Sequence, residues 1–418
     1  MGVRYMNKFF SLMVISFLLI LTACDGSEQT NGESKDSEAL KIGAIFPLSG
    51  GLAMLGEESY RGVELAIEQR NKYGGVADGK KIELIKGDAP DPDSAQSEAN
   101  RLINQENIKT IVGSYSSGIA QAASEVTERN GVLFWEYGAV ADSITDRGYK
   151  YVLRTNPPAS YLSKTHIDFI KNYVAEKLGK DLSDLKVAIA HEDSSYGSTI
   201  ADEAEKLAKK EGINIITVQP YSAASNDLSS VVLNLKKAKP DVLIAVSYLN
   251  DGILLHRQSQ ELGLKVPVVV GSGGGHDMAD FREGVGDMGD GILDVAFPQY
   301  QINPEFTPGM EEFVKIYKEK YGEEPRSGHS LVHFMGTNVL LDLIDEVGEI
   351  DPDKLREAAM NYKVETGKTV TGWGVEFDPK TGQNKLSEPY VHQWIDGKLL
   401  TVWPEKVAVQ EPEINNKK

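Results

Sequence analysis

Residues 107–130, NIKTIVGSYSSGIAQAASEVTERN, contain the two patterns that decide the fold of this chain. The apolar run 108–112 is typical of a buried strand, and residues 119–129 have the pattern of an amphipathic helix. The first N–H groups of a helix lack backbone acceptors and carry partial positive charge. Ser116 and Ser117, in the turn between strand and helix, therefore mark a candidate site for a carboxylate. A serine that caps the helix without any ligand is the alternative interpretation.

The same alternation of strand and helix continues along the chain. A first series predicts strands at 41–46, 81–86, 107–112 and 132–135, with helices at 56–73, 93–106 and 117–130. After 151–154, a second series predicts helices at 160–178, 197–211, 227–238 and 250–262, with strands at 186–191, 213–218, 241–247 and 266–270. Next come a strand at 291–297, helices at 308–321 and 328–347, and tail strands at 370–377, 392–395 and 399–402. This order indicates an α/β fold with two doubly wound parallel sheets. Ligands of such folds bind beyond the carboxyl ends of the strands.

The length and the net charge of the chain limit the kinds of function that it can have. A chain of 418 residues suggests two domains. The formal net charge is −18, which disfavours binding to nucleic acid and points to a small-molecule ligand. The single cysteine excludes a disulfide within the chain.

The N-terminal residues predict export and lipid anchoring. Two basic residues precede the apolar run 9–21, which is too short for an ordinary membrane-spanning helix and typical of a signal peptide over 1–23. The sequence LTAC, ending at Cys24, resembles the lipobox of bacterial lipoproteins, so we expect a lipid on Cys24. The alternative is an ordinary signal peptide followed by a free thiol. Residues 24–39 are polar and predict a flexible tether on an extracytoplasmic, lipid-anchored protein.

Segments spread over the chain resemble a known family. They include IGAIFPLSGG from Ile42, VGSYSSGIAQAAS from Val112 and HEDSSYG from His191. Their order and spacing, to about residue 400, are similar to those of the branched-chain amino-acid-binding proteins of ATP-driven (ABC) importers. The resemblance implies the type I periplasmic-binding-protein fold, in which two α/β lobes are joined by a three-strand hinge.

By this resemblance the chain crosses between lobes near residues 154, 297 and 370. The first lobe then takes 40–154 plus 298–369, the second takes 155–297 plus 370–405, and a tail follows at 406–418.

The resemblance also assigns ligand-binding residues. Ser117, with Ser116 beside it, stands where the family's carboxylate-binding serine stands. Gly138, Ala139 and Val140 match a segment that offers the ligand a backbone carbonyl, an amide and a threonine hydroxyl, and valine lacks that hydroxyl.

On the opposite lobe, Tyr196 and Tyr248 match aromatic residues that close over the ligand. The family's ammonium-binding acid aligns at about Gly273, which cannot perform that role. Either Glu136, Asp251 or Asp277 replaces it, or the ligand lacks an α-amino group. Trp135 and Tyr137 beside Glu136 suggest a pocket for a flat ligand, and could equally be core residues.

Signatures of catalysis and of cofactor binding are weak. The glycine run 271–275 lacks dinucleotide-binding spacing. His329 and His333 lie one helical turn apart but lack the glutamate and third ligand of a zinc hydrolase, so we expect packing or surface histidines and no metal.

We therefore expect no enzyme and no cofactor, but a solute-binding protein that delivers an amino acid or related small carboxylate to an ABC permease. The alternatives are a binder of amides or aromatic carboxylates with the same fold, and a receptor that reports its ligand to a membrane kinase.

Overall fold

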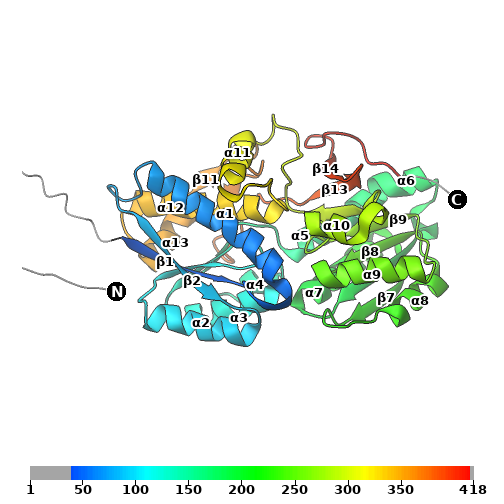
Figure 1. The fold of residues 1–418 in the computed structure, drawn as a ribbon, viewed down its shortest axis with the longest axis horizontal. Coiled ribbons are helices and arrows are strands. Elements are labelled where there is room, and N and C mark those ends of the chain that lie inside the picture. Colours follow the sequence, from blue (N-terminus) through cyan, green and yellow to red (C-terminus); the bar gives the residue numbers. More distant parts are fainter. Residues whose placement is uncertain (1–38, 415–418) are drawn as a thin grey trace, which may run out of the picture. The chain divides into compact units, whose positions relative to one another are not determined.

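Residues 39–414 are described by the computed structural model, and the expected signal peptide, Cys24 and nearly all of the tether lie outside this range. The first lobe is built on a parallel sheet with strand order β2-β1-β3-β4-β5 (Figure 1). Its strands are β1 Leu40–Phe46, β2 Ile82–Asp88, β3 Thr110–Gly113, β4 Leu133–Glu136 and β5 Val152–Arg154. The connecting helices are α1 Ala53–Lys72, α2 Pro92–Asn104, α3 Ser117–Arg129 and α4 Ser143–Asp146.

Both faces of this sheet are covered because successive side chains of a strand point to opposite sides. In β1, Ile42, Ala44 and Phe46 belong to an apolar cluster that includes residues of α1. Ile45 belongs to a second cluster, with α2 and α3. The sheet is therefore buried over β3, β4 and β5, while its edge strand β2 is partly exposed, and the strand ends are left to form a site.

The second lobe repeats this design with a larger, mixed sheet of order β14-β13-β10-β9-β8-β6-β7. Its elements up to the last parallel strand are α5 Ala159–Phe169, α6 Ala175–Leu178, β6 Lys186–Glu192, α7 Ser195–Glu211, β7 Asn214–Tyr221, α8 Ser229–Ala238, β8 Val242–Val246, α9 Leu249–Glu261, β9 Val268–Gly271, α10 Ala279–Val285 and β10 Leu293–Ala296. Strands β13 Tyr390–Ile395 and β14 Lys398–Trp403 add an antiparallel edge. The two residues between them, Asp396 and Gly397, both have positive φ, as a tight hairpin turn requires.

The chain returns to the first lobe between these two parts. Helices α11 Met310–Tyr321, α12 Gly328–Val347 and α13 Pro352–Asn361 follow β10, and α12 packs along α1 (Figure 1). The short strands β11 Lys363–Val364 and β12 Val375–Glu376 pair with each other. Phe377 then packs edge-on against Trp135 of β4, with ring centroids 5.6 Å apart. Residues 363–384 therefore lie with the first lobe, and we propose that the third crossing lies near 384–390 rather than near 370.

The expected fold, two α/β lobes with three connections, is confirmed, and most helix limits agree with the sequence pattern to within three residues. Helices α10 and α13 were not predicted, and of the strand expected at 370–377 only Val375–Glu376 forms. Trp135 and Tyr137 are both fully buried core residues.

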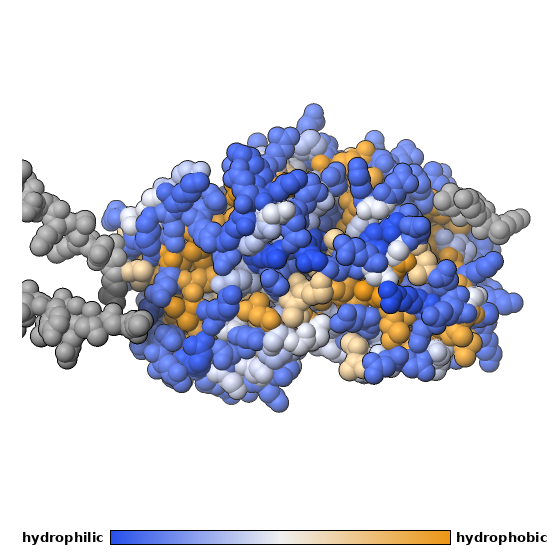
Figure 2. Space-filling model, viewed as in Figure 1, coloured by the Kyte–Doolittle hydropathy of each residue, from blue (hydrophilic) through white to orange (hydrophobic). Residues whose placement is uncertain are grey.

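Figure 2 shows mainly hydrophilic residues on the face drawn, with hydrophobic residues in separate small areas. Within residues 39–414, no helix is long and apolar enough to cross a membrane.

Arg154 ties the first crossing to its surroundings. The side chain is fully buried at the end of β5. Its guanidinium donates to Gln383 Oε1 (2.6 Å), Ala141 O (2.8 Å) and Thr145 Oγ1 (3.2 Å). Burial lowers the pKa of Arg154 to about 10, which leaves the group charged at neutral pH.

Replacing this residue tests the packing at the crossing. Arg154→Met removes the donors and leaves buried oxygens unpaired, so we expect the free energy of unfolding to fall by about 3 kcal/mol in urea titrations. Arg129→Met, at an exposed ion pair with Glu125, is the control and should change stability by less than about 1 kcal/mol. Equal stability of the two variants would contradict this role for Arg154.

Candidate functional site

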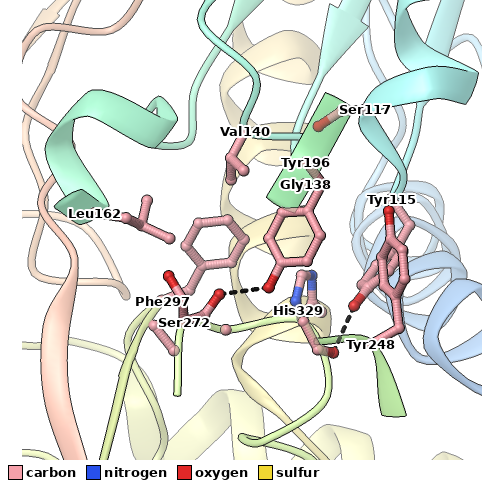
Figure 3. Close-up of a pocket in the computed structure, with 13 residues that line it drawn as sticks. Tyr115, Ser117, Gly138, Val140, Leu162, Tyr196, Tyr248, Ser272, Phe297 and His329 are labelled. Carbon is pink, nitrogen blue, oxygen red and sulfur yellow. Dashed lines mark hydrogen bonds between the residues drawn. The ribbon is translucent and has the colours of Figure 1, made fainter. Parts of the chain in front are cut away.

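A cavity of about 20 Å³, room for about one water molecule, lies where the carboxyl ends of strands from both lobes meet. Thirteen described residues line it (Figure 3), and none of them is Asp, Glu, Lys or Arg. From the first lobe come Tyr115, Ser117, Gly138, Val140 and His329, and from the second Leu162, Tyr196, Tyr248, Ser272, Gly273, Gly274, Ala296 and Phe297. The cavity is therefore uncharged and rich in aromatic rings.

Ser117 lies in the cavity wall as the first residue of α3. The first hydrogen bond of this helix runs from Ala120 N to Ser116 O (2.9 Å), so the N–H groups before it have no partner within the helix. The hydroxyl of Ser117 accepts from Ala141 N (3.1 Å) and keeps its own proton for a further acceptor. The start of α3 thus offers this cavity the Ser117 hydroxyl as a donor that suits an anion, while Gly118 and Ile119 line a neighbouring cavity.

Glu136 holds the two loops that carry the first-lobe part of the site. Its side chain is fully buried at the end of β4, and Oε1 accepts from Ser114 N (2.9 Å), Tyr137 N (3.0 Å), Gly138 N (2.7 Å) and Ala139 N (2.7 Å). The other oxygen accepts from Ser114 Oγ (3.0 Å). Burial raises the pKa of Glu136, and these donors act in the opposite direction. Because this carboxylate faces protein donors, it does not line the cavity.

Gly138 occupies a position where a larger residue would not fit. A Cβ atom there would lie 2.8 Å from both His333 Cε1 and Ser114 O. The loop after β4 can therefore approach the turn before α3 only with glycine at this position.

Three tyrosines close the cavity from both sides. Tyr115 donates to Gly274 O, and Tyr196 donates to Ser272 O at 2.6 Å (Figure 3). The ring of Tyr248 lies between them, with centroid distances of 6.1 Å to Tyr115 and 5.0 Å to Tyr196. Since Tyr115 follows β3 and Gly274 follows β9, this hydrogen bond joins the two lobes directly.

The glycine loop after β9 fits tightly under these rings. Gly273 and Gly274 have φ of 64° and 68°, and a Cβ on Gly274 would lie 2.6 Å from the hydroxyl of Tyr196. The fully buried Asp294 accepts from Gly273 N at 2.9 Å. No sequence motif indicated this role for Asp294. Gly273 therefore lies in a loop that Asp294 holds through a backbone N–H group, and it contributes no acidic side chain to the cavity.

The other sequence-predicted residues lie around the cavity rather than in its wall. Ser116 and Asp251 line a neighbouring cavity on the other side of Tyr248. Ala139 is buried, and its carbonyl accepts from Arg154 (3.2 Å). Asp277 is buried and accepts from Gln299 Nε2 at 3.1 Å. Burial raises the pKa of Asp251 and of Asp277 to about 7.

The two histidines of α12 have different surroundings, which the sequence did not distinguish. Both are buried, but only His329 lines the cavity. The ring nitrogens of His333 lie 2.6 Å from His329 O and 2.8 Å from Ser114 O. Within residues 39–414, no group of His, Cys, Asp or Glu side chains is arranged to hold a metal ion. The two histidines that resemble an incomplete zinc motif thus include His329, a residue of the cavity wall that the sequence did not identify.

The buried charge of Asp277 predicts a pH-dependent stability difference. Between an unfolded pKa near 3.8 and a folded pKa of about 7, only the folded state keeps the proton, so this group stabilises the fold progressively less as pH rises towards 7. Asp277→Asn should therefore raise the free energy of unfolding at pH 8, on the order of 2 kcal/mol, and change it little at pH 4. The exposed Asp202→Asn is the control for urea titrations at both pH values. The same effect of Asp277→Asn at both would contradict the assignment.

Comparison with known proteins agrees with this architecture. The family model described as "Periplasmic binding protein" matches residues 39–398. Leu/Ile/Val-binding protein homolog 7 of Brucella suis is 44% identical over 381 residues, which cover 91% of this chain and 95% of the relative.

Solved structures share the fold at lower identity. A leucine-binding protein, LivK of Thermotoga maritima, has a TM-score of 0.76 at 22% identity, covering 88% of this chain and 99% of that one. LivJ of Streptococcus pneumoniae in complex with isoleucine has 0.74 at 23%, with coverage of 90% and 100%. A solute-binding protein of Rhodopseudomonas palustris in complex with 3,4-dihydroxybenzoic acid has 0.73 at 23%, with coverage of 91% and 100%. The chain belongs to the periplasmic binding proteins, a family of substrate-binding proteins.

Proposed function

We propose that this protein is an extracytoplasmic solute-binding lipoprotein of an ABC importer, which captures an amino acid or a related small carboxylate between its lobes. The observation that carries the proposal is the start of α3, where the hydroxyl of Ser117 lines an uncharged cavity. A carboxylate there gains charge-assisted hydrogen bonds and the favourable end of the helix dipole.

Capture requires a ligand that contacts both lobes. Ser117 and Val140 offer contacts from the first lobe, and Tyr196 and Tyr248 from the second. A ligand that bridges these residues stabilises the closed arrangement by its differential affinity for it. Delivery then follows from a permease that engages the closed form and releases the solute.

The class of carboxylate is not set by the fold. Structures of similar fold were solved with isoleucine and with 3,4-dihydroxybenzoic acid. In this chain, Glu136 faces backbone donors and Gly273 lacks a side chain, so neither supplies a partner for an α-ammonium group.

Replacement of Ser117 tests carboxylate capture. Ser117→Ala removes one donor to a charged group, so affinity for a carboxylate ligand found by thermal-shift screening should weaken by roughly 1 to 3 kcal/mol in calorimetry. Ser97→Ala, on the exposed face of α2, is the control and should bind as the parent does. Unchanged affinity of a correctly folded Ser117→Ala protein would contradict the proposal.

The lipid anchor has its own test. Cys24→Ala should move the protein from the membrane fraction to the soluble extracytoplasmic fraction, because the attachment site of the acyl chains is lost. Ser27→Ala, in the expected tether, should stay with membranes in the same immunoblots. Persistent membrane attachment of Cys24→Ala would rule out the anchor.

A further inference from the structure

His329 is the one polar side chain of the described cavity wall that has an atom left without a partner. Its Nδ1 is buried and finds no hydrogen bond among residues 39–414. The other polar side chains of the wall have protein partners: Ser117 accepts from Ala141, Tyr115 donates to Gly274, Tyr196 donates to Ser272 O, the Ser272 hydroxyl bonds His166, and Tyr248 interacts with Ser116 and Ser194. Buried polar atoms normally have a hydrogen-bond partner, so we expect a bound molecule or an ordered water at Nδ1.

The imidazole is held in a fixed place. Ser327 caps α12 by accepting from His329 N at 3.1 Å. A Cβ on Gly328 would lie 2.4 Å from Pro298 O, so this turn is packed closely against the second crossing. The side chain of His329 is therefore presented from a rigid helix start rather than from a loop.

Aromatic rings flank the imidazole on two sides. The ring centroids of Tyr115 and Phe297 lie 4.7 Å and 5.0 Å from that of His329 (Figure 3). Burial and the nearby His333 hold the pKa of His329 well below its usual value, so the ring is neutral at physiological pH. A neutral imidazole offers one donor and one acceptor and carries no charge to bind an acid group.

We propose that His329 is a specificity-determining residue, which hydrogen-bonds a hydroxyl group on the planar ring of an aromatic carboxylate. The inference rests on the proposed function, because the carboxylate itself is assigned to Ser117 and the start of α3. The wall is uncharged and rich in aromatic rings, a chemistry that suits a flat ring without an ammonium group.

The test compares benzoate, the three monohydroxybenzoates and leucine by isothermal titration calorimetry. For the parent protein, at least one hydroxybenzoate should bind about ten-fold more tightly than benzoate, as expected for one additional hydrogen bond. His329→Phe keeps a ring but removes both nitrogens, so it should abolish this preference, and benzoate and the hydroxybenzoates should then bind the variant with affinities within about two-fold of one another. His256→Phe, at a histidine outside the cavity, is the matched control and should keep the preference.

Each outcome bears on one claim. Equal affinity of the parent for benzoate and all three hydroxybenzoates overturns the role of His329, even if His329→Phe fails to fold. Failure of every aromatic acid to bind overturns it as well, and leucine binding in that case leaves carboxylate capture intact. A hydroxybenzoate that binds Ser117→Ala as tightly as the parent would instead refute the proposed function.

Discussion

The buried carboxylate of Glu136 organises the first-lobe half of the site. One oxygen accepts four backbone N–H groups from the turn before α3 and from the loop after β4. These two segments carry Tyr115, Ser117, Gly138 and Val140, so Glu136 holds the loops of every first-lobe residue of the cavity wall except His329. A charge so placed stabilises loop geometry, and its donors compensate part of the cost of burial.

The second lobe uses acids in the same way. Glu192, at the end of β6, accepts from Ser194 N (2.8 Å) and Gly197 N (2.6 Å) and so fixes the start of α7, which carries Tyr196. Asp294, in β10, holds the glycine loop through Gly273 N. Buried carboxylates thus hold the loops and helix starts that carry the cavity residues, and no charged side chain is part of the described cavity wall.

The elements of the fold could be predicted because each has a local pattern. The strand and helix of residues 107–130 differ in periodicity, and α3 begins at Ser117 as expected. Helix α13 was missed although Asp351 and Pro352 mark its start, because it is a short helix in which only Leu355 and Ala359 are buried. The placement of residues 375–384 beside β4 and β5 depends on contacts more than two hundred residues apart in sequence, which no local pattern contains.

Part of the candidate site could also be predicted from the sequence. Resemblance located Ser117, Gly138, Val140, Tyr196 and Tyr248, all of which line the cavity. It could not show that Glu136 faces backbone donors, since an acid after a strand looks the same in either role. Nor could it separate His329 from His333, because their difference lies in which side of α12 meets the cavity.

The central claim is that an anionic ligand binds at the start of α3, between the lobes. A crystal structure with the tightest-binding carboxylate from a thermal-shift screen of amino acids, amides and aromatic acids tests it most directly. We expect the ligand carboxylate oxygens within hydrogen-bond distance of Ser117 Oγ at the start of α3, with Tyr196 and Tyr248 against the rest of the ligand. A ligand whose carboxylate lies elsewhere, or one held in the neighbouring cavity beyond Tyr248, would contradict it.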